Sequence, residues 1–162
     1  MRRNAMAILA GLSLGVAILA SAGLAAAGTQ EDLEAIEKVR KMEVAGVNSG
    51  DPDNAVRAYA DDVVQLAPNE PAIAGKSNIR AWIAGMYEQF DLKINYTSAD
   101  VTVSGDWASE HYAGTATFMP KDGSASVTED IKGIHIYKRQ ADGSWRITHD
   151  IWNTDAPAAA ME

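Results

Sequence analysis

The hydrophobic pattern of this chain changes its period near residue 91, and this change limits the fold more than any other feature. Before that point, most apolar positions recur at the spacing of helices, whereas from residue 92 they alternate with polar positions as in strands. Helices followed by an antiparallel series of strands predict an α+β fold. We expect a cone-shaped roll, in which N-terminal helices pack on a strongly curved, mainly antiparallel sheet. A curved sheet closed by helices leaves a cavity between them.

Capping and turn residues set the expected limits of these elements. The sequence predicts helices over residues 29–48, 51–59 and 76–90, with a short strand at 63–67. Four longer strands are expected at residues 92–104, 107–119, 127–139 and 143–153. The alternation slips near Ser98-Ala99-Asp100, which predicts a β-bulge in the first of these long strands.

The N-terminal segment has the features of an export signal. Two arginines follow Met1, no other charged residue occurs before Glu31, and the small residues Ala25-Ala26-Ala27 provide a cleavage site. We therefore predict a signal peptide at residues 1–27, a single domain at 28–155 and a flexible tail at 156–162. An uncleaved membrane anchor is the alternative interpretation of the apolar run. Export would place the mature protein in the periplasm or outside the cell.

Charge and composition argue against several classes of partner. The chain has 14 basic and 22 acidic residues, and removal of Arg2 and Arg3 with the leader changes the net charge from −8 to −10. An acidic surface disfavours binding to nucleic acid or to anionic membranes. The sequence also has no cysteine, no glycine-rich phosphate loop and no serine nucleophile elbow. We therefore expect no cofactor and no disulfide.

Several short motifs, taken in order, resemble those of a known superfamily. They are Pro68-Asn69-Glu70-Pro71 with Gly75-Lys76, Ser104-Gly105-Asp106-Trp107, Trp145-Arg146-Ile147 and Asp150-Ile151-Trp152-Asn153. With the helix order around them, they resemble the nuclear transport factor 2-like superfamily, and most closely its SnoaL-like, ketosteroid isomerase-like branch. The resemblance implies the cone-shaped roll and a homodimer formed through the outer face of the sheet. It implies no single activity, because the superfamily includes isomerases, cyclases, epoxide hydrolases, dehydratases and non-enzymes.

The resemblance also allows a test for steroid isomerase activity. In those enzymes, a tyrosine on the first helix and an acid on a late strand hold the enolate oxygen, and an aspartate after the first strand moves the proton. In this sequence, the position of the tyrosine falls on Glu43 and that of the late-strand acid falls near His135. The position of the aspartate that moves the proton falls on Ala67. The isomerase residues are therefore absent, and the resemblance does not imply that activity.

Glu43 is the most informative polar residue, because it falls on the apolar stripe of the first helix. If it faces the cavity, burial would raise its pKa and make it a candidate general acid or base. Alternatively, it lies at the edge of the stripe and reaches water or a basic neighbour. Glu110 presents a similar choice: it lies inward with Ala108 and Tyr112, or it faces solvent if Trp107 is the inward residue.

The last strand carries polar candidates on both of its faces. Trp145, Ile147 and His149 share one face, and Asp150 shares the other with Trp152. If Trp145 and Ile147 lie in the core, His149 points inward as well. The family resemblance instead emphasises Asp150 and Trp152. His149 and Asp150 cannot both line one pocket without a bulge, so we keep both as candidates.

These arguments give one set of catalytic candidates and one of binding candidates. The catalytic candidates are Glu43, His149 and Asp150. The expected ligand-binding residues are Glu110, His135, Trp152, Asn153 and Met86. His111, His135 and His149 lie on successive strands but lack the local spacing of a histidine metal site, so we predict no metal centre.

Three functions fit the sequence. The first is an exported protein that binds a small apolar or aromatic molecule without chemistry. The second is an acid/base enzyme of the isomerase, cyclase or dehydratase type, with Glu43 or His149 as proton carrier. The third is a dimeric interaction module. The absent isomerase residues favour the first interpretation over the second.

Overall fold

The computed structural model describes residues 29–155, so the expected leader at 1–27 and tail at 156–162 lie outside the described residues. The helices are α1 (Gln30–Asn48), α2 (Pro52–Ala55) and α3 (Lys76–Gln89). The strands are β1 (Tyr59–Leu66), β2 (Ile73–Ala74), β3 (Phe90–Ser104), β4 (Trp107–Pro120), β5 (Val127–Arg139) and β6 (Trp145–Thr154). The predicted α+β class is confirmed. No helix among these residues is both long and apolar enough to cross a membrane.

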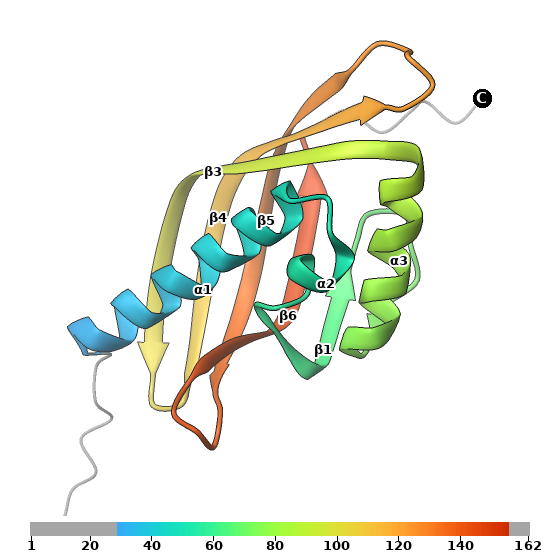
Figure 1. The fold of residues 1–162 in the computed structure, drawn as a ribbon. Helices are drawn as coiled ribbons and strands as arrows, with labels where there is room; N and C mark the ends of the chain where they lie inside the picture. The colour runs from blue at the N-terminus through green and yellow to red at the C-terminus, as the bar shows by residue number, and fades with distance from the viewer. Residues whose placement is uncertain (1–28, 156–162) are drawn as a thin grey trace, which may run out of the picture.

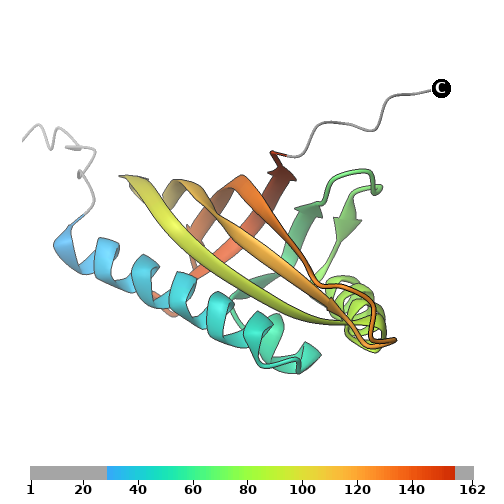
Figure 2. The same cartoon turned by 90° about the horizontal axis from the view of Figure 1, so that it is seen from above.

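All six strands form one sheet in the order β2-β1-β6-β5-β4-β3. Every pairing is antiparallel except that of β1 with β6, so the sheet is mainly antiparallel, as predicted. Figures 1 and 2 show that the sheet is strongly curved, that α1 runs along its inner face and that α3 lies beside β1. The helices and the curved sheet therefore enclose the space in which the pocket lies.

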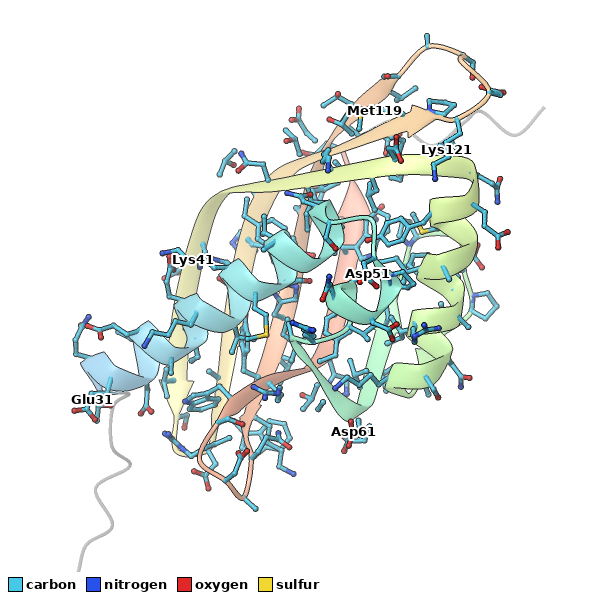
Figure 3. All side chains as sticks on the ribbon, viewed as in Figure 1. Glu31, Lys41, Asp51, Asp61, Met119 and Lys121 are labelled. Carbon is cyan, nitrogen blue, oxygen red and sulfur yellow. The ribbon has the colours of Figure 1, made fainter. Side chains whose placement is uncertain are left out.

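The first helix places one polar side chain among apolar ones. A capping box of Thr29 and Asp32 starts α1, and both reciprocal hydrogen bonds of the box are present. Its buried residues are Ile36, Val39, Glu43, Gly46 and Val47. Charged residues of the other face, such as Glu31 and Lys41, are exposed (Figure 3). Glu43 is thus held on the inward stripe by the helical period itself.

The second helix is shorter and the first strand longer than the sequence suggests. We expected helix at residues 51–59, but α2 ends at Ala55 and β1 begins at Tyr59. The backbone N–H of Ile147 donates a hydrogen bond to the Ala58 carbonyl oxygen, at 3.0 Å. Local propensity favours helix up to residue 59, but pairing with β6, which is distant in sequence, ends the helix earlier and makes Tyr59 the first residue of the strand.

Two register shifts, each typical of a β-bulge, interrupt the antiparallel pairings among β3, β4, β5 and β6. The register of β3 against β4 shifts between Tyr96 and Ser98, close to the predicted bulge. The second shift lies between β5 and β6, where Tyr137 pairs with Ile147 and Ile136 pairs with His149. Thr148, the residue between the two β6 partners, is therefore the extra residue of the bulge.

The second bulge decides which face of the last strand points inward. Trp145 and Ile147 are buried before it, and Asp150 is buried after it, whereas His149 is only half-buried. The inward face changes from odd-numbered to even-numbered residues at Thr148. The expectation that a core Ile147 brings His149 inward is therefore corrected, because it assumed an unbroken alternation along the strand.

Candidate functional site

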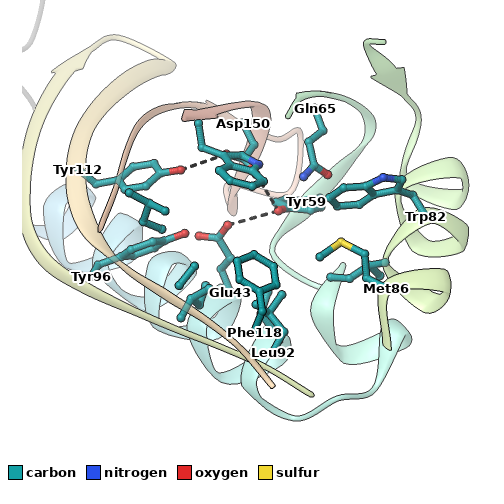
Figure 4. A pocket seen from close by; sticks show the side chains of 16 residues that line it. Glu43, Tyr59, Gln65, Trp82, Met86, Leu92, Tyr96, Tyr112, Phe118 and Asp150 are labelled. Atoms are coloured by element: carbon teal, nitrogen blue, oxygen red, sulfur yellow. Dashed lines mark hydrogen bonds between the residues drawn. The ribbon is translucent and has the colours of Figure 1, made fainter. Parts of the chain in front are cut away.

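A pocket with a volume of about 70 Å³ lies between α1, α3 and the sheet. Its wall is largely apolar and includes Val47, Trp82, Ile83, Met86, Leu92 and Phe118. Its polar side chains are Glu43, Tyr59, Gln65, Tyr96, Tyr112 and Asp150. Figure 4 shows that the acids Glu43 and Asp150 and three of the tyrosines gather at one end, with Trp82 and Met86 of α3 at the other and Gln65 between Asp150 and Trp82. The pocket is therefore an apolar cavity with one polar inner end.

Tyr59 links two acids at this inner end. Its hydroxyl oxygen lies 3.3 Å from Glu43 Oε1 and 3.1 Å from Asp150 Oδ2. A phenol has a single proton to donate, so both contacts can be hydrogen bonds only if one of the two carboxyl groups carries a proton. The Tyr112 hydroxyl lies 3.4 Å from the other Asp150 oxygen, Oδ1. The two acids are thus coupled through shared protons.

His135 lies behind these acids, fully buried on β5. Its Nε2 is 3.4 Å from Glu43 Oε1 and 3.4 Å from Asp150 Oδ1. Neither approach has the alignment of a hydrogen bond, and Nε2 has no hydrogen-bond partner within residues 29–155. Its other ring nitrogen, Nδ1, lies 3.1 Å from Glu110 Oε2. The ring is therefore fixed on one side and faces two carboxyl groups on the other.

Glu110 is a fully buried acid that the structure supplies with partners on two sides. Arg40 of α1 forms an ion pair with its Oε1, and the Tyr137 hydroxyl donates to its Oε2. Arg40 also pairs with Glu37, one turn earlier on the helix. Burying a charged group costs free energy unless an opposite charge compensates it, and Arg40 provides this compensation for the Glu110 carboxylate.

Burial and neighbouring charges shift the pKa values of this cluster in different directions. Burial raises the pKa of Glu43, and the positive charge of His135 offsets part of the rise. Burial alone would lower the pKa of His135, but the neighbouring Glu43, Asp150 and Glu110 raise it well above the usual value. Burial would raise the pKa of Glu110, yet hydrogen bonds from His135, Tyr137 and Arg40 lower it overall.

The charge count agrees with these directions. Three carboxyl groups, those of Glu43, Glu110 and Asp150, face two cationic groups, Arg40 and His135. With a charged His135, one further proton would make these five groups neutral together, and the burial that raises the pKa of Glu43 favours the protonated form of that carboxyl group. A neutral buried cluster avoids the large cost of an unbalanced charge.

A sequence comparison shows which family has this architecture. The profile of the SnoaL-like domain family matches residues 39–149, which is more than half of the chain. The chain belongs to the SnoaL-like family. The predicted resemblance to the nuclear transport factor 2-like superfamily is thereby confirmed. A comparison with curated proteins finds no significant match for this SnoaL-like chain.

Solved structures resemble the SnoaL-like chain in fold. A ketosteroid isomerase-like protein from Erwinia carotovora atroseptica is 23% identical, with a TM-score of 0.69, over 80% of this chain and 100% of that one. A proposed dehydratase of the nuclear transport factor 2-like family from Streptomyces avermitilis is 16% identical, with a TM-score of 0.66, over 78% and 98%. A protein with a cystatin-like fold from Novosphingobium aromaticivorans is 18% identical, with a TM-score of 0.66, over 80% and 86%. Domains of this fold are commonly ligand-binding domains or enzymes of the isomerase or dehydratase type.

The structure of the SnoaL-like domain brings some of the expected site residues to the pocket. Glu43, Asp150, Met86 and Trp152 line it. His135 and Glu110 lie directly behind Glu43 and Asp150, both fully buried. Of the two alternatives for Glu110, the structure has the inward one, with Ala108 and Tyr112 buried beside it.

Two expected site residues lie elsewhere. His149 is on the opposite face of β6 from Asp150, and its Nδ1 lies 3.2 Å from Thr148 Oγ1. Asn153 is exposed, and its side-chain oxygen accepts from the Thr154 N–H. The bulge at Thr148 explains both placements, because after it the even-numbered residues of β6 point inward. Neither residue lines the pocket.

Several site residues carried no separate signal in the sequence. Each of four tyrosines, taken alone, has the pattern of a core residue in a strand: Tyr59, Tyr96, Tyr112 and Tyr137. Gln65, taken alone, has the pattern of a polar residue in a short strand. The available clue was the shared face of Glu110 with Tyr112 on one strand and of His135 with Tyr137 on the next. When adjacent strands carry polar residues on the same face and opposite one another, those residues form a polar cluster if the face is buried.

Proposed function

We propose that this SnoaL-like domain binds a small, largely apolar molecule and transfers a proton to or from it. The observation that carries the proposal is the arrangement of Glu43, Tyr59 and Asp150 at the inner end of an apolar pocket. An apolar wall binds the body of the ligand, and the carboxyl groups meet its reacting end. Proton transfer by a positioned carboxyl group is the chemistry of isomerases and dehydratases.

The ligand would need one polar group at its inner end. Gln65 lines the pocket, is buried, and its Oε1 has no hydrogen-bond partner within residues 29–155. A buried amide without a partner costs free energy unless a ligand satisfies it. Gln65 would therefore orient a hydroxyl or carbonyl group of the substrate, since the amide offers both a donor and an acceptor. The carboxyl groups of Glu43 and Asp150 would then exchange protons with the neighbouring carbon or oxygen.

Binding without conversion is the second candidate function. The absence of the steroid isomerase residues favours it, and the volume of about 70 Å³ limits the ligand to a compact molecule, because a cavity that holds benzene has about 150 Å³. A molecule larger than this would have to displace Trp82 or Met86 at the outer end of the pocket.

Conversion assays with a matched pair of variants separate the two functions. Small enones, hydroxy-carbonyl compounds and epoxides are incubated with the wild type, Glu43→Gln and Glu88→Gln, and larger phenolic compounds test whether Trp82 and Met86 can move aside. Glu43→Gln should lower turnover of an accepted compound by about 10²–10⁴-fold, the usual contribution of a general acid or base. Glu88 is exposed on α3, so Glu88→Gln should leave turnover unchanged.

The outcomes of this assay are distinct. Full turnover by Glu43→Gln would remove Glu43 as the proton carrier. Binding without conversion, detected by native mass spectrometry of the purified protein, would establish the second function. A protein that binds none of these compounds and carries no copurified ligand would contradict both.

We further propose that the domain is exported and acts as a homodimer. The proposal of export is supported by the leader-like residues 1–27, which lie outside the described part of the chain. N-terminal sequencing of protein from cells should find a start near Gly28. An intact Met1 in the membrane fraction would instead support an anchor.

A further inference from the structure

Three buried side chains from three different elements converge beneath the pocket. Glu43 of α1, His135 of β5 and Asp150 of β6 each offer one donor atom, and these atoms all lie within 4.8 Å of one another. The three residues are 2%, 0% and 4% exposed. One imidazole nitrogen and two carboxylate oxygens form a mixed donor set, which suits divalent transition metals better than calcium or magnesium.

Two atoms of this set lack partners. His135 Nε2 and Glu43 Oε2 have no hydrogen-bond partner among residues 29–155, although both are buried. Buried polar atoms in folded proteins are nearly always paired, so two unpaired atoms in one cluster indicate a missing partner. Both belong to residues of the convergent set. A cation bound to His135 Nε2 would satisfy that atom, and binding of the same ion through both oxygens of Glu43 would satisfy Glu43 Oε2 as well.

The two separations that involve His135 fit a shared ion better than hydrogen bonds. Nε2 of His135 is 3.4 Å from Glu43 Oε1 and 3.4 Å from Asp150 Oδ1. Charge-assisted hydrogen bonds between such groups would be shorter, at about 2.7–2.9 Å. Two donors bound to one zinc ion at about 2.1 Å, with a tetrahedral angle between them, lie about 3.4 Å apart.

The surrounding groups support each of the three donors. Metal-binding histidines usually donate their other ring N–H to a carboxylate, and His135 Nδ1 lies 3.1 Å from Glu110 Oε2. Tyr59 and Tyr112 contact the Asp150 carboxyl group at 3.1 and 3.4 Å. Arg40 neutralises Glu110, which leaves the charges of Glu43 and Asp150 to balance a divalent ion.

We propose that Glu43, His135 and Asp150 form a binding site for a divalent metal ion of the zinc type. Glu43 and Asp150 also line the pocket, so an ion held by them would lie beside the space that a ligand would enter. The ion takes the place of two protons, one on His135 and one shared by the two acids, because metal ligands bind in their deprotonated forms. This inference goes beyond the proposed function and is separate from it: Glu43 and Asp150 exchange protons with a substrate only while no ion is bound, and ion binding requires neither a substrate nor turnover.

Calorimetric titration of Zn²⁺ into chelator-treated protein tests the proposal. The wild type should bind one ion per chain. His135→Gln, Glu43→Gln and Asp150→Asn each remove one donor and should weaken binding by more than about 100-fold. Glu110→Gln should weaken it by about 10–100-fold, the usual effect of losing a group that orients a ligand. His111→Gln and Glu88→Gln are the matched controls on exposed residues and should bind as the wild type does.

A second measurement covers variants that fail to fold. Co²⁺ bound by the wild type should give the intense visible absorption of a four-coordinate site, and excess Zn²⁺ should remove it. Glu43→Gln keeps the shape of the side chain, so its circular dichroism should match that of the wild type while the cobalt absorption is lost. Absence of stoichiometric Zn²⁺ binding by the wild type would overturn the proposal. Zn²⁺ affinity that none of the donor variants changes would overturn it equally. Neither result would bear on conversion of an organic substrate.

Discussion

The Tyr59 hydroxyl lies 3.1 Å from Asp150 Oδ2, and this contact joins the first long strand of the sheet to the last. The two residues are 91 positions apart in sequence, and β1 and β6 are parallel neighbours in the sheet. Burial, together with the negative charges of Asp150 and Glu43, raises the pKa of Tyr59 well above its usual value. The phenol therefore remains a hydrogen-bond donor throughout the neutral range.

Tyr59→Phe should destabilise the domain by about 1.5–3 kcal/mol, because it removes a buried donor from a charged acceptor. Tyr87→Phe is the matched control, since its hydroxyl donates to the neutral carbonyl oxygen of Val47 at 2.7 Å. That change should cost only about 0.5–1.5 kcal/mol. Urea unfolding measures both free energies. Equal losses in the two variants would contradict a special role of the Tyr59 contact.

Gly133→Ala should destabilise the domain by about 1–3 kcal/mol through overpacking. Gly133 pairs with Tyr112 across the sheet, and an added Cβ would lie 2.4 Å from Tyr112 Cζ and 2.4 Å from the Ile151 carbonyl oxygen. Gly85→Ala is the control in α3, where an added Cβ meets nothing within 4 Å. That substitution should stabilise the domain by about 0.5–1 kcal/mol. Thermal unfolding should show shifts of opposite sign for the two variants.

Asp32 should contribute a pH-dependent part of the stability. Burial would raise its pKa, but hydrogen bonds from Arg139, Trp145 and Thr29 lower it overall. A lowered folded-state pKa gives stability that is present above the unfolded pKa, near 3.9, and is lost as the pH falls through the folded value. The free energy of unfolding of the wild type should exceed that of Asp32→Asn by about 1 kcal/mol or less at pH 7.

This difference should shrink below pH ~4, where the carboxyl group of Asp32 becomes protonated. Glu31→Gln removes another acid from the same helical turn without touching Arg139, and serves as the control. A difference between the wild type and Asp32→Asn that stays constant from pH 7 to pH 3 would show that the charge of Asp32 is not the cause.

Ile134→Lys should weaken self-association if the outer face of the sheet forms the dimer interface. Ile134 and Ile151 are paired neighbours on β5 and β6, and they are 42% and 39% exposed. Light scattering with size-exclusion chromatography should find a dimer for the wild type and a larger monomer fraction for the variant. Leu33→Lys changes a similarly exposed apolar residue on α1 and should leave the dimer intact. A wild type that is monomeric at every concentration tested would contradict this prediction.

The local parts of the fold could be predicted from the sequence, because they depend on neighbouring residues. The strand at 127–139 has the predicted limits, and the predicted helix ending at Asn48 ends there. The bulge near Ser98 was visible as a slip in the alternation of apolar residues. Glu43 could be recognised because a charged residue on an apolar helical stripe departs from the pattern around it.

The remaining parts depend on contacts between residues far apart in sequence. The bulge at Thr148 left no signal, since a threonine is compatible with either face of a strand. That one residue decides between His149 and Asp150, so the site could not be completed from the pattern of β6 alone. The pairing of Arg40 with Glu110 spans 70 positions, and only the curvature of the sheet brings the two together.

The two ends of the pocket are built by different elements. Trp82, Ile83 and Met86 of α3 form part of the apolar wall. Within residues 29–155, none of the hydrogen bonds and ion pairs that fix Glu43, His135 or Asp150 involves a residue of α3. Substitutions on α3 can therefore change the shape of the apolar end of the pocket without displacing Glu43, His135 or Asp150. In a lineage of such proteins, ligand preference would be free to diverge quickly while the buried acids and their histidine stay the same.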